Sequence, residues 1–276
     1  MPENQSIKYF ISTGCSFTDV PVPEIEHLTH VNIDEYTHCA LSWPVHVNNH
    51  LGSVPKYRGK GASGNGIISR TTIYEVNEAL KEYKEDEILV GIMWSGAYRQ
   101  ELYYTKPDMN FHSVYSPLIN GKNPASIGQG YNFYKVMPYW EDELSKFYYK
   151  NIYDEIGSYM LTLENILRTQ WYLKSKNIKY FMTTYYPAVF PSQEILNHLD
   201  IKYLYDMIDF DYFLPVKSEW NWCCDFQDPK TWYLEFKDHP TLSWMLDGSN
   251  PHPNTLQHKA FADKVIMPFL ESKGWI

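Results

Sequence analysis

The sequence predicts a three-layer α/β/α sandwich built on a mainly parallel, flavodoxin-like sheet. Short runs of β-branched and aromatic residues alternate with longer stretches in which apolar residues recur at helical spacing. Residues 87–94, EILVGIMW, form an almost unbroken apolar run, which is typical of a central parallel strand covered on both faces. Because 276 residues fit one α/β domain, we expect a single domain over residues 1–276.

The first half of the chain predicts two strands and two helices before that central strand. Residues 7–13 are expected to form the first strand, because they are β-branched and aromatic and end at Gly14. A helix is expected over 41–51. A second strand at 53–58 leads into a glycine-rich loop, and the helical spacing of apolar residues predicts a helix at 67–83.

The second half predicts further strands and helices and two irregular segments. From about 96 to 146 the chain is rich in Gly, Pro, Asn, Tyr and Phe, and its length predicts an aromatic-rich insertion or lid over a cleft. A second irregular, aromatic-rich segment is expected from about 210 to 246. The remaining elements expected are a long helix at 148–176, a strand at 179–186, a weaker strand near 203–208 and a closing helix at 254–272.

Charge and composition exclude several classes of protein. The formal net charge is -9 and there is no cluster of Lys or Arg, so nucleic acid is not an expected partner. No signal peptide pattern and no apolar run of membrane-spanning length is present, so we expect a cytoplasmic protein with no membrane partner. The cysteines lack zinc-site spacing and are interpreted as free thiols; they are Cys15, Cys39, Cys223 and Cys224.

A candidate nucleophile follows the first expected strand. Ser16 lies in the loop Gly14-Cys15-Ser16-Phe17-Thr18, where a serine on a tight turn is exposed and close to backbone N–H groups. The alternative is a Ser/Thr turn without a catalytic role.

The loop from Gly59 to Gly66 permits two interpretations. It contains the pattern G-x-G-x-x-G between a strand and a helix, which would suit a nucleotide held by the Gly59–Gly64 loop. However, it follows the second strand rather than the first, and no strand-end acid stands about twenty residues further on. The same loop could instead aim the Gly61 N–H and the Asn65 amide at a developing oxyanion.

A candidate general base precedes the closing helix. His252 stands between two prolines, with Asp247 five residues earlier, which suits an imidazole fixed for proton transfer. The alternative is a surface or helix-capping histidine, and Asp238-His239 is a competing base. His46 and His50 have a zinc-compatible i, i+4 spacing but are interpreted as a surface pair.

The order of these motifs resembles that of the SGNH (GDSL-like) hydrolase family. The resemblance implies Ser16 as nucleophile, Gly61 as an oxyanion donor and His252 as base. The chain departs from the family pattern at three places: Cys15 replaces the usual Asp, no Asn follows the third strand, and Ser249 occupies the usual Asp position three before the histidine. Asn65 is therefore the expected amide donor, with Ser95 as the alternative.

The loop at 61–65 and the stretch Trp94-Ser95…Arg99-x-Glu101 are similar to those of divergent members encoded by bacteriophages. That similarity would allow a location in the host cytoplasm or the virion.

The expected function is a serine esterase of SGNH type. Ser16 would attack an ester, such as an O-acetyl group on a carbohydrate, while His252 takes the proton and Asp247 orients the imidazole. No metal or cofactor is required, and the expected partner is a small-molecule or glycan ester. The alternatives are a non-catalytic binding or virion-associated structural protein on the same fold, and a nucleotide-binding protein.

Overall fold

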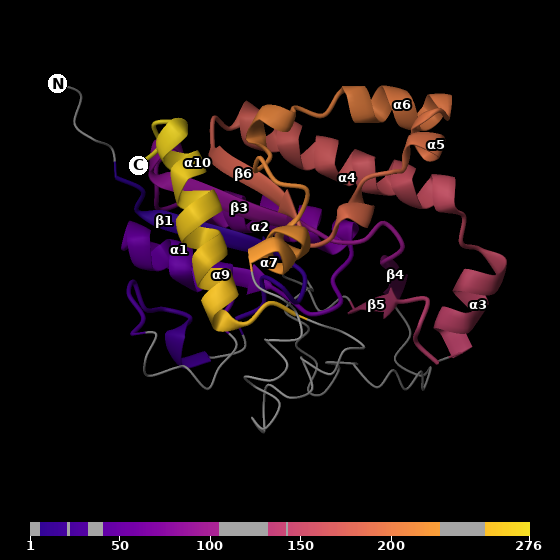
Figure 1. Cartoon of the computed structure of the whole chain (residues 1–276), viewed down its shortest axis with the longest axis horizontal. Coiled ribbons are helices and arrows are strands. Elements are labelled where there is room, and N and C mark those ends of the chain that lie inside the picture. The colour runs from indigo at the N-terminus through magenta and orange to yellow at the C-terminus, as the bar shows by residue number, and fades with distance from the viewer. Residues whose placement is uncertain (1–5, 21–22, 33–40, 105–131, 142, 227–251) are drawn as a thin grey trace.

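A four-stranded parallel sheet forms the centre of the protein (Figure 1). The computed structural model describes residues 6–20, 23–32, 41–104, 132–141, 143–226 and 252–276. The strands lie in the order β2-β1-β3-β6, and their bounds are Val54–Gly59, Tyr9–Gly14, Ile88–Trp94 and Lys179–Thr184. Strand β2 lies on one side of β1, and the later strands β3 and β6 lie on the other side. This is the strand order of flavodoxin-like sheets, whose ligands bind at the carboxyl ends of the strands.

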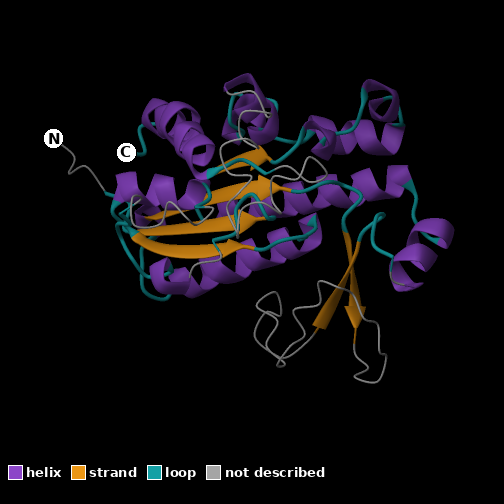
Figure 2. Ribbon diagram, turned by 60° about the horizontal axis from the view of Figure 1, so that its bottom comes forward, coloured by secondary structure: helices purple, strands orange, loops and turns teal. Residues whose placement is uncertain are grey.

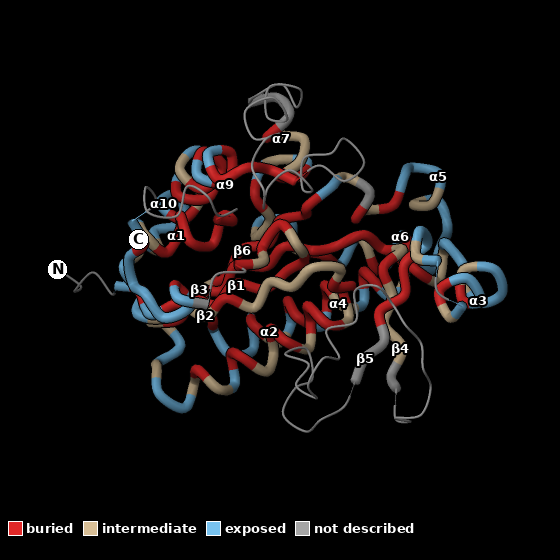
Figure 3. The backbone as a smooth tube through the Cα atoms, turned by 90° about the horizontal axis from the view of Figure 1, so that it is seen from below, coloured by how far each residue is buried: buried red, intermediate tan, exposed pale blue. Residues whose placement is uncertain are grey.

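Helices cover both faces of the sheet, so the predicted α/β class with a parallel sheet is confirmed. One face carries α2 (Asn65–Ala79) and α4 (Glu155–Ser175), and the other carries α1 (Trp43–Leu51), α9 (Thr255–Phe261) and α10 (Met267–Ser272) (Figures 2 and 3). Between α9 and α10 the helix widens into a π-helical segment, Ala262–Ile266.

The hydrophobic core lies between these layers. Every residue of β3 is buried, as the apolar run predicts for a central strand (Figure 3). At Gly91 an added Cβ would stand 2.8 Å from Trp43 and 2.7 Å from Phe181, so the two aromatic rings pack directly on the strand backbone. These contacts join the α1 face of the sheet to β3 and β6.

The structure corrects two predicted elements. The weaker strand predicted near 203–208 is wrong: residues 203–206 belong to the helix α6, Leu199–Asp206. Ile201 and Leu204 of α6, and Ile208 just after it, are buried at helical rather than alternating spacing. The long helix predicted at 148–176 is two helices, α3 (Glu143–Asn151) and α4. The break falls where the Asp154 side chain accepts a hydrogen bond from the Gly157 N–H and caps α4.

The segment predicted as an irregular insertion contains a β-ribbon. Strands β4 (Gln100–Tyr104) and β5 (Asn132–Val136) pair antiparallel and form a separate two-stranded sheet. The second irregular segment includes the helix α7 (Glu219–Phe226) in its described part. The remaining short elements are α5 (Gln193–Leu196) and 3-10 turns at Pro23–Ile25, Glu85–Glu87, Pro187–Val189 and Phe210–Tyr212.

Among the described helices, none combines the length and the apolar character needed to cross a lipid bilayer.

Candidate active site

The loop that carries Ser16 is held at the carboxyl end of β1 by its own turn and by neighbouring backbone. The N–H of Thr18 donates to the carbonyl of Cys15, and the N–H of Asp19 donates to the carbonyl of Ser16. At Gly59 a Cβ would stand 2.2 Å from the Thr18 carbonyl, so only glycine lets the end of β2 approach this closely. Ser16 itself is half-buried and therefore still reaches the surface.

His252 is placed by the start of α9. The side chain of Asn254 accepts from the Gln257 N–H at 2.9 Å, and the side chain of Gln257 accepts from the Asn254 N–H at 2.8 Å. This capping box fixes the chain just after His252. The Nε2 atom of His252 lies 2.7 Å from the Oγ of Ser16, and its ring packs 4.7 Å from that of Phe17, centre to centre. Two residues separated by 236 positions thus form a hydrogen-bonded pair.

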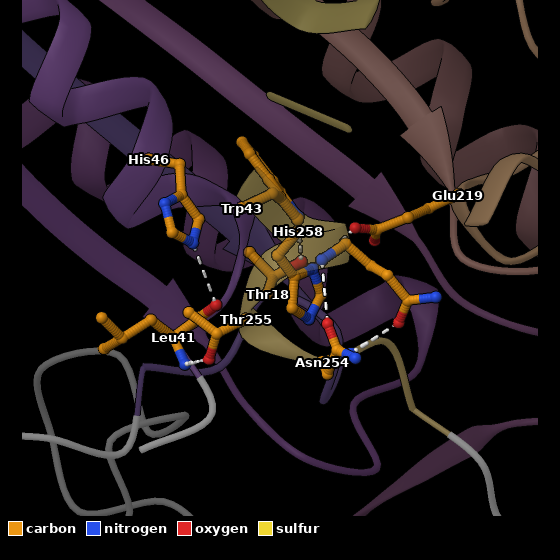
Figure 4. A network of polar contacts seen from close by, with 9 residues as sticks. Thr18, Leu41, Trp43, His46, Glu219, Asn254, Thr255 and His258 are labelled. Atoms are coloured by element: carbon orange, nitrogen blue, oxygen red, sulfur yellow. Dashed lines mark hydrogen bonds and ion pairs between the residues drawn. The ribbon is translucent and has the colours of Figure 1, made fainter. Parts of the chain in front are cut away.

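A buried polar network anchors α9, the helix that follows His252 (Figure 4). His258 Nδ1 lies 2.7 Å from Oε1 of Glu219 on α7, and the Leu41 N–H donates to the Thr255 hydroxyl. Burial lowers the pKa of His258 and raises the pKa of Glu219, so neither charge is favoured there. The network connects α9 to α7 and to the segment before α1, and thereby limits the movement of His252.

The predicted oxyanion donors Gly61, Asn65 and Ser95 are engaged with other protein atoms. The Gly61 N–H donates to the Asp19 carboxylate at 3.0 Å. The Asn65 amide donates to the Ser95 carbonyl at 2.9 Å and to the Thr162 hydroxyl at 3.1 Å, while its oxygen accepts from the Ser95 N–H. Both amide hydrogens of Asn65 are therefore in use, and in this conformation Asn65 holds the end of β3 instead of facing an oxyanion.

The backbone N–H of Ser16 is a remaining candidate donor. Within the part of the chain that the structure describes, no acceptor is paired with it. Such an N–H, on the residue that carries the nucleophile, is a common component of an oxyanion hole.

The glycine-rich loop does not offer a free phosphate site. A nucleotide phosphate would need the N-terminus of α2, but the buried carboxylate of Glu101 already accepts from the Ile67 N–H at 3.1 Å. At Gly64 a Cβ would stand 2.5 Å from the Arg99 carbonyl, so close packing against the residue before β4 explains this glycine. The geometry therefore argues against the nucleotide-binding alternative.

Arg99 lies near the Ser16–His252 pair, although in the sequence it stands out only as part of a stretch similar to bacteriophage proteins. Arg99 is 8% exposed, its Nη1 donates to the Ser95 hydroxyl at 3.0 Å, and its guanidinium lies 4.7 Å from the centre of the Tyr185 ring. The Tyr185 ring packs 5.4 Å from that of Phe17, which in turn packs on His252. The only signal in the sequence is an arginine shortly after a strand end.

Lys135 and Asp19 add charge around the glycine-rich loop. The Lys135 ammonium donates to the Gly61 carbonyl at 2.7 Å, and burial lowers the pKa of Lys135 to about 8. Burial raises the pKa of Asp19, against the opposing effects of Lys60 and the Gly61 N–H.

The two histidines with zinc-compatible spacing, His46 and His50, contact different partners. His46 is buried and its Nε2 lies 3.3 Å from the Leu41 carbonyl, whereas His50 contacts Asp263 at 2.7 Å, so the interpretation of a surface pair is wrong for His46. Among the described residues, no three His, Cys, Asp or Glu side chains are grouped to hold a metal ion. Asp247, Ser249, Asp238 and His239 lie outside the described residues, so the assignment of Asp247 stays a prediction.

The fold and site define a three-layer α/β protein with a serine–histidine pair at the carboxyl edge of its sheet. The sequence matches a family of unknown function, DUF6071, over residues 26–215, and the chain belongs to this family. The matched region includes Gly61, Asn65, Ser95 and Arg99 but neither Ser16 nor His252.

Curated proteins and solved structures provide no information about the site. No curated protein matches the sequence. Among solved structures, the crystal structure of the protein YxiM from Bacillus subtilis is similar, with a TM-score of 0.39 and 13% identity. That alignment covers 98% of this chain but 57% of YxiM, so the chain spans little more than half the length of that protein.

Proposed function

We propose that the protein is a serine ester hydrolase in which Ser16 is the nucleophile and His252 the general base. The observation that carries the proposal is the 2.7 Å contact between the Ser16 Oγ and the His252 Nε2. A nucleophile and base within hydrogen-bond reach, with the serine half-exposed at a strand end, are the minimum that acyl transfer requires.

In the proposed reaction the Ser16 oxygen attacks the ester carbonyl while His252 Nε2 takes the hydroxyl proton. The tetrahedral intermediate then expels the alcohol, which leaves with the proton from His252. Water next attacks the acyl-serine, giving its proton to His252, and the acid departs as Ser16 recovers its proton. The acyl group, such as the acetyl group of a carbohydrate ester, is thus transferred to water without oxidation or reduction.

The alternative is a non-catalytic binding protein on the same fold. The shortage of free oxyanion donors favours it. The Ser16 N–H is a candidate donor, but the Gly61 N–H serves only if the Asp19 carboxylate releases it. A protein whose neighbouring donors are occupied could hold a ligand at Ser16 without hydrolysing it.

A fluorophosphonate probe separates the two functions, because it reacts only with an activated serine. We expect stoichiometric labelling of Ser16, mapped by peptide mass spectrometry, and loss of labelling in Ser16→Ala and His252→Gln. The matched control is Ser42→Ala, a buried serine at the start of α1 whose hydroxyl has no partner among the described residues. Failure of the native chain to label, together with no hydrolysis of acetyl esters, would favour the binding protein.

A further inference from the structure

Among the described residues, the groups around the buried guanidinium of Arg99 are neutral. They include the Ser95 hydroxyl, the Tyr139 side chain and the rings of Tyr185 and Tyr98, whose centres lie 4.7 and 5.8 Å from the guanidinium carbon. The hydroxyls of these two tyrosines lie 2.6 Å apart. The aromatic rings attract the cation and fix its plane, but each is a neutral partner.

No carboxylate in the described part of the chain pairs with Arg99. The ion pairs of the described residues do not include it, and its Nε is buried without a hydrogen-bond acceptor. The titratable groups that act most strongly on its charge are the thiol of Cys15 and the phenols of Tyr185, Tyr98 and Tyr139, which are neutral in their ordinary form at neutral pH. A buried cation without an anion is costly, so binding an anion here would offset part of that cost.

This cation adjoins the Ser16–His252 pair. The ring of Tyr185, on which the guanidinium stacks, contacts Phe17, the residue after Ser16, and Phe17 contacts the ring of His252. Ser95, which accepts the hydrogen bond from Arg99, directly follows β3, the neighbour of β1 in the sheet. Arg99 is therefore connected to the Ser16–His252 pair through the rings of Tyr185 and Phe17.

We propose that Arg99 binds a carboxylate group of the ester substrate, and so makes the site selective for acidic esters. The inference rests on the proposed function, because that function places the ester at Ser16. A carboxylate fits better than a phosphate, since one cation with one unpaired Nε–H and two aromatic walls matches a single planar negative charge.

Binding of simple anions tests the site without turnover. In the full-length Ser16→Ala protein we expect saturable binding of benzoate by calorimetry, with little binding of uncharged benzamide. Arg99→Gln in that background should weaken benzoate binding by on the order of 10- to 100-fold, the usual loss for a hydrogen bond between charged groups. Benzoate should also raise the melting temperature of the protein with Arg99 but not of the Arg99→Gln protein.

The matched control is Arg168→Gln. Arg168 is an exposed arginine of α4 that also donates to a serine hydroxyl, that of Ser69, but it belongs to the surface between α4 and α2. Its removal changes net charge by the same amount and should leave benzoate binding unchanged. If Arg99→Gln does not fold, Arg99→Lys keeps the charge and loses the planar fork of donors, and we expect it to bind benzoate several-fold more weakly.

A substrate pair tests selectivity in the protein with Ser16. The ratio of kcat/KM for 4-acetoxybenzoate to that for 4-acetoxybenzamide should fall by on the order of 10- to 100-fold in Arg99→Gln, mainly through a higher KM for the carboxylate ester. An equal fall in kcat for both esters would overturn the proposal, because Arg99 would then act on the oxyanion.

The outcomes separate this inference from the proposed function. Hydrolysis of both esters with no dependence of their ratio on Arg99 overturns the carboxylate site and leaves the hydrolase standing. Benzoate binding through Arg99 with no hydrolysis of either ester overturns the hydrolase and leaves the carboxylate site standing. Tighter Arg99-dependent binding of inorganic phosphate than of benzoate overturns the choice of a carboxylate, and absence of benzoate binding overturns the site altogether.

Discussion

At the residue scale, Gly59 and Gly61 stand two positions apart in the same loop but differ in the space around them. A Cβ at Gly59 would overlap the Thr18 backbone at 2.2 Å, and the Thr18 carbonyl cannot swing aside as a flexible side chain would. Gly59→Ala should therefore displace the Ser16 loop. We expect a loss of about 1–3 kcal/mol in the free energy of unfolding, as for overpacked sites, and much slower labelling of Ser16 by a fluorophosphonate.

Gly61→Ala is the control for that substitution. The nearest atom to a Cβ at Gly61 is an Asp19 carboxylate oxygen at 3.8 Å, an ordinary contact. Urea unfolding and labelling rates of the two variants provide the comparison. Equal stability and labelling for both would show that Gly59 does not position Ser16.

Ser16 and His252 could be proposed from the sequence because each stands beside a strand end or helix start that the sequence itself predicts. The hydrogen bonds of Asn65, by contrast, depend on Thr162 and on the backbone of Ser95, which only the folded chain brings together. The sequence does not indicate Arg99 as a binding residue for the same reason. A single arginine has no periodic or spaced pattern, and its isolation from carboxylates appears only in three dimensions.

At the scale of elements, the start of α2 depends on a residue from another element. Its N-cap, Gly64, offers no side-chain acceptor, and Glu101 of β4 supplies the missing one to the Ile67 N–H. Glu101→Ala should therefore leave a buried N–H without a partner and lower the free energy of unfolding by about 1–3 kcal/mol. Equilibrium urea unfolding measures the change.

Two further variants show whether the lost hydrogen bond or the lost charge causes that change in stability. Glu101→Gln keeps an oxygen acceptor and should lose less stability than Glu101→Ala. Glu78→Ala removes a carboxylate from the exposed side of α2, where its contact with Lys81 is at the surface, and should change stability by less than about 0.5 kcal/mol. A loss in Glu78→Ala as large as in Glu101→Ala would argue that charge, and not the cap, is responsible.

The sequence predicts elements that are buried in the sheet, because burial requires apolar residues. It does not predict elements that are stabilised by residues distant in the chain. The strands β1, β3 and β6 lie within a residue or two of their expected bounds, because their apolar runs reflect burial directly. The edge strand β2 lies within one residue of its expected bounds although it is only partly buried. The ribbon of β4 and β5 joins segments separated by residues 105–131, so its pairing leaves no local signal. The helical pattern of α6 is hard to recognise in the sequence because two of its apolar residues, Leu199 and Tyr203, are exposed, as is Met207 just after it.

At the scale of the whole molecule, buried histidines link stability to pH. Burial lowers the pKa of His46 from its ordinary value of 6.5 to about 3. Between these values the unfolded chain binds a proton that the folded chain does not, so the free energy of unfolding falls as the pH falls through this window. His258 acts in the same direction, whereas the raised pKa values of Asp19, Glu101 and Glu219 act in the opposite direction.

Because these groups oppose one another, the contribution of His46 is measured as a difference between variants. His46→Gln retains a neutral donor for the Leu41 carbonyl but cannot titrate. Between about pH 7 and about pH 5 we expect the variant to lose about 2 kcal/mol less free energy of unfolding than the native chain, the value for one proton bound only by the unfolded state. His27→Gln, in an exposed turn, should lose as much as the native chain. Parallel pH profiles for His46→Gln and the native chain would mean that the His46 imidazole is protonated in the folded protein, and that the packing of α1 against the Leu41 carbonyl tolerates a charge.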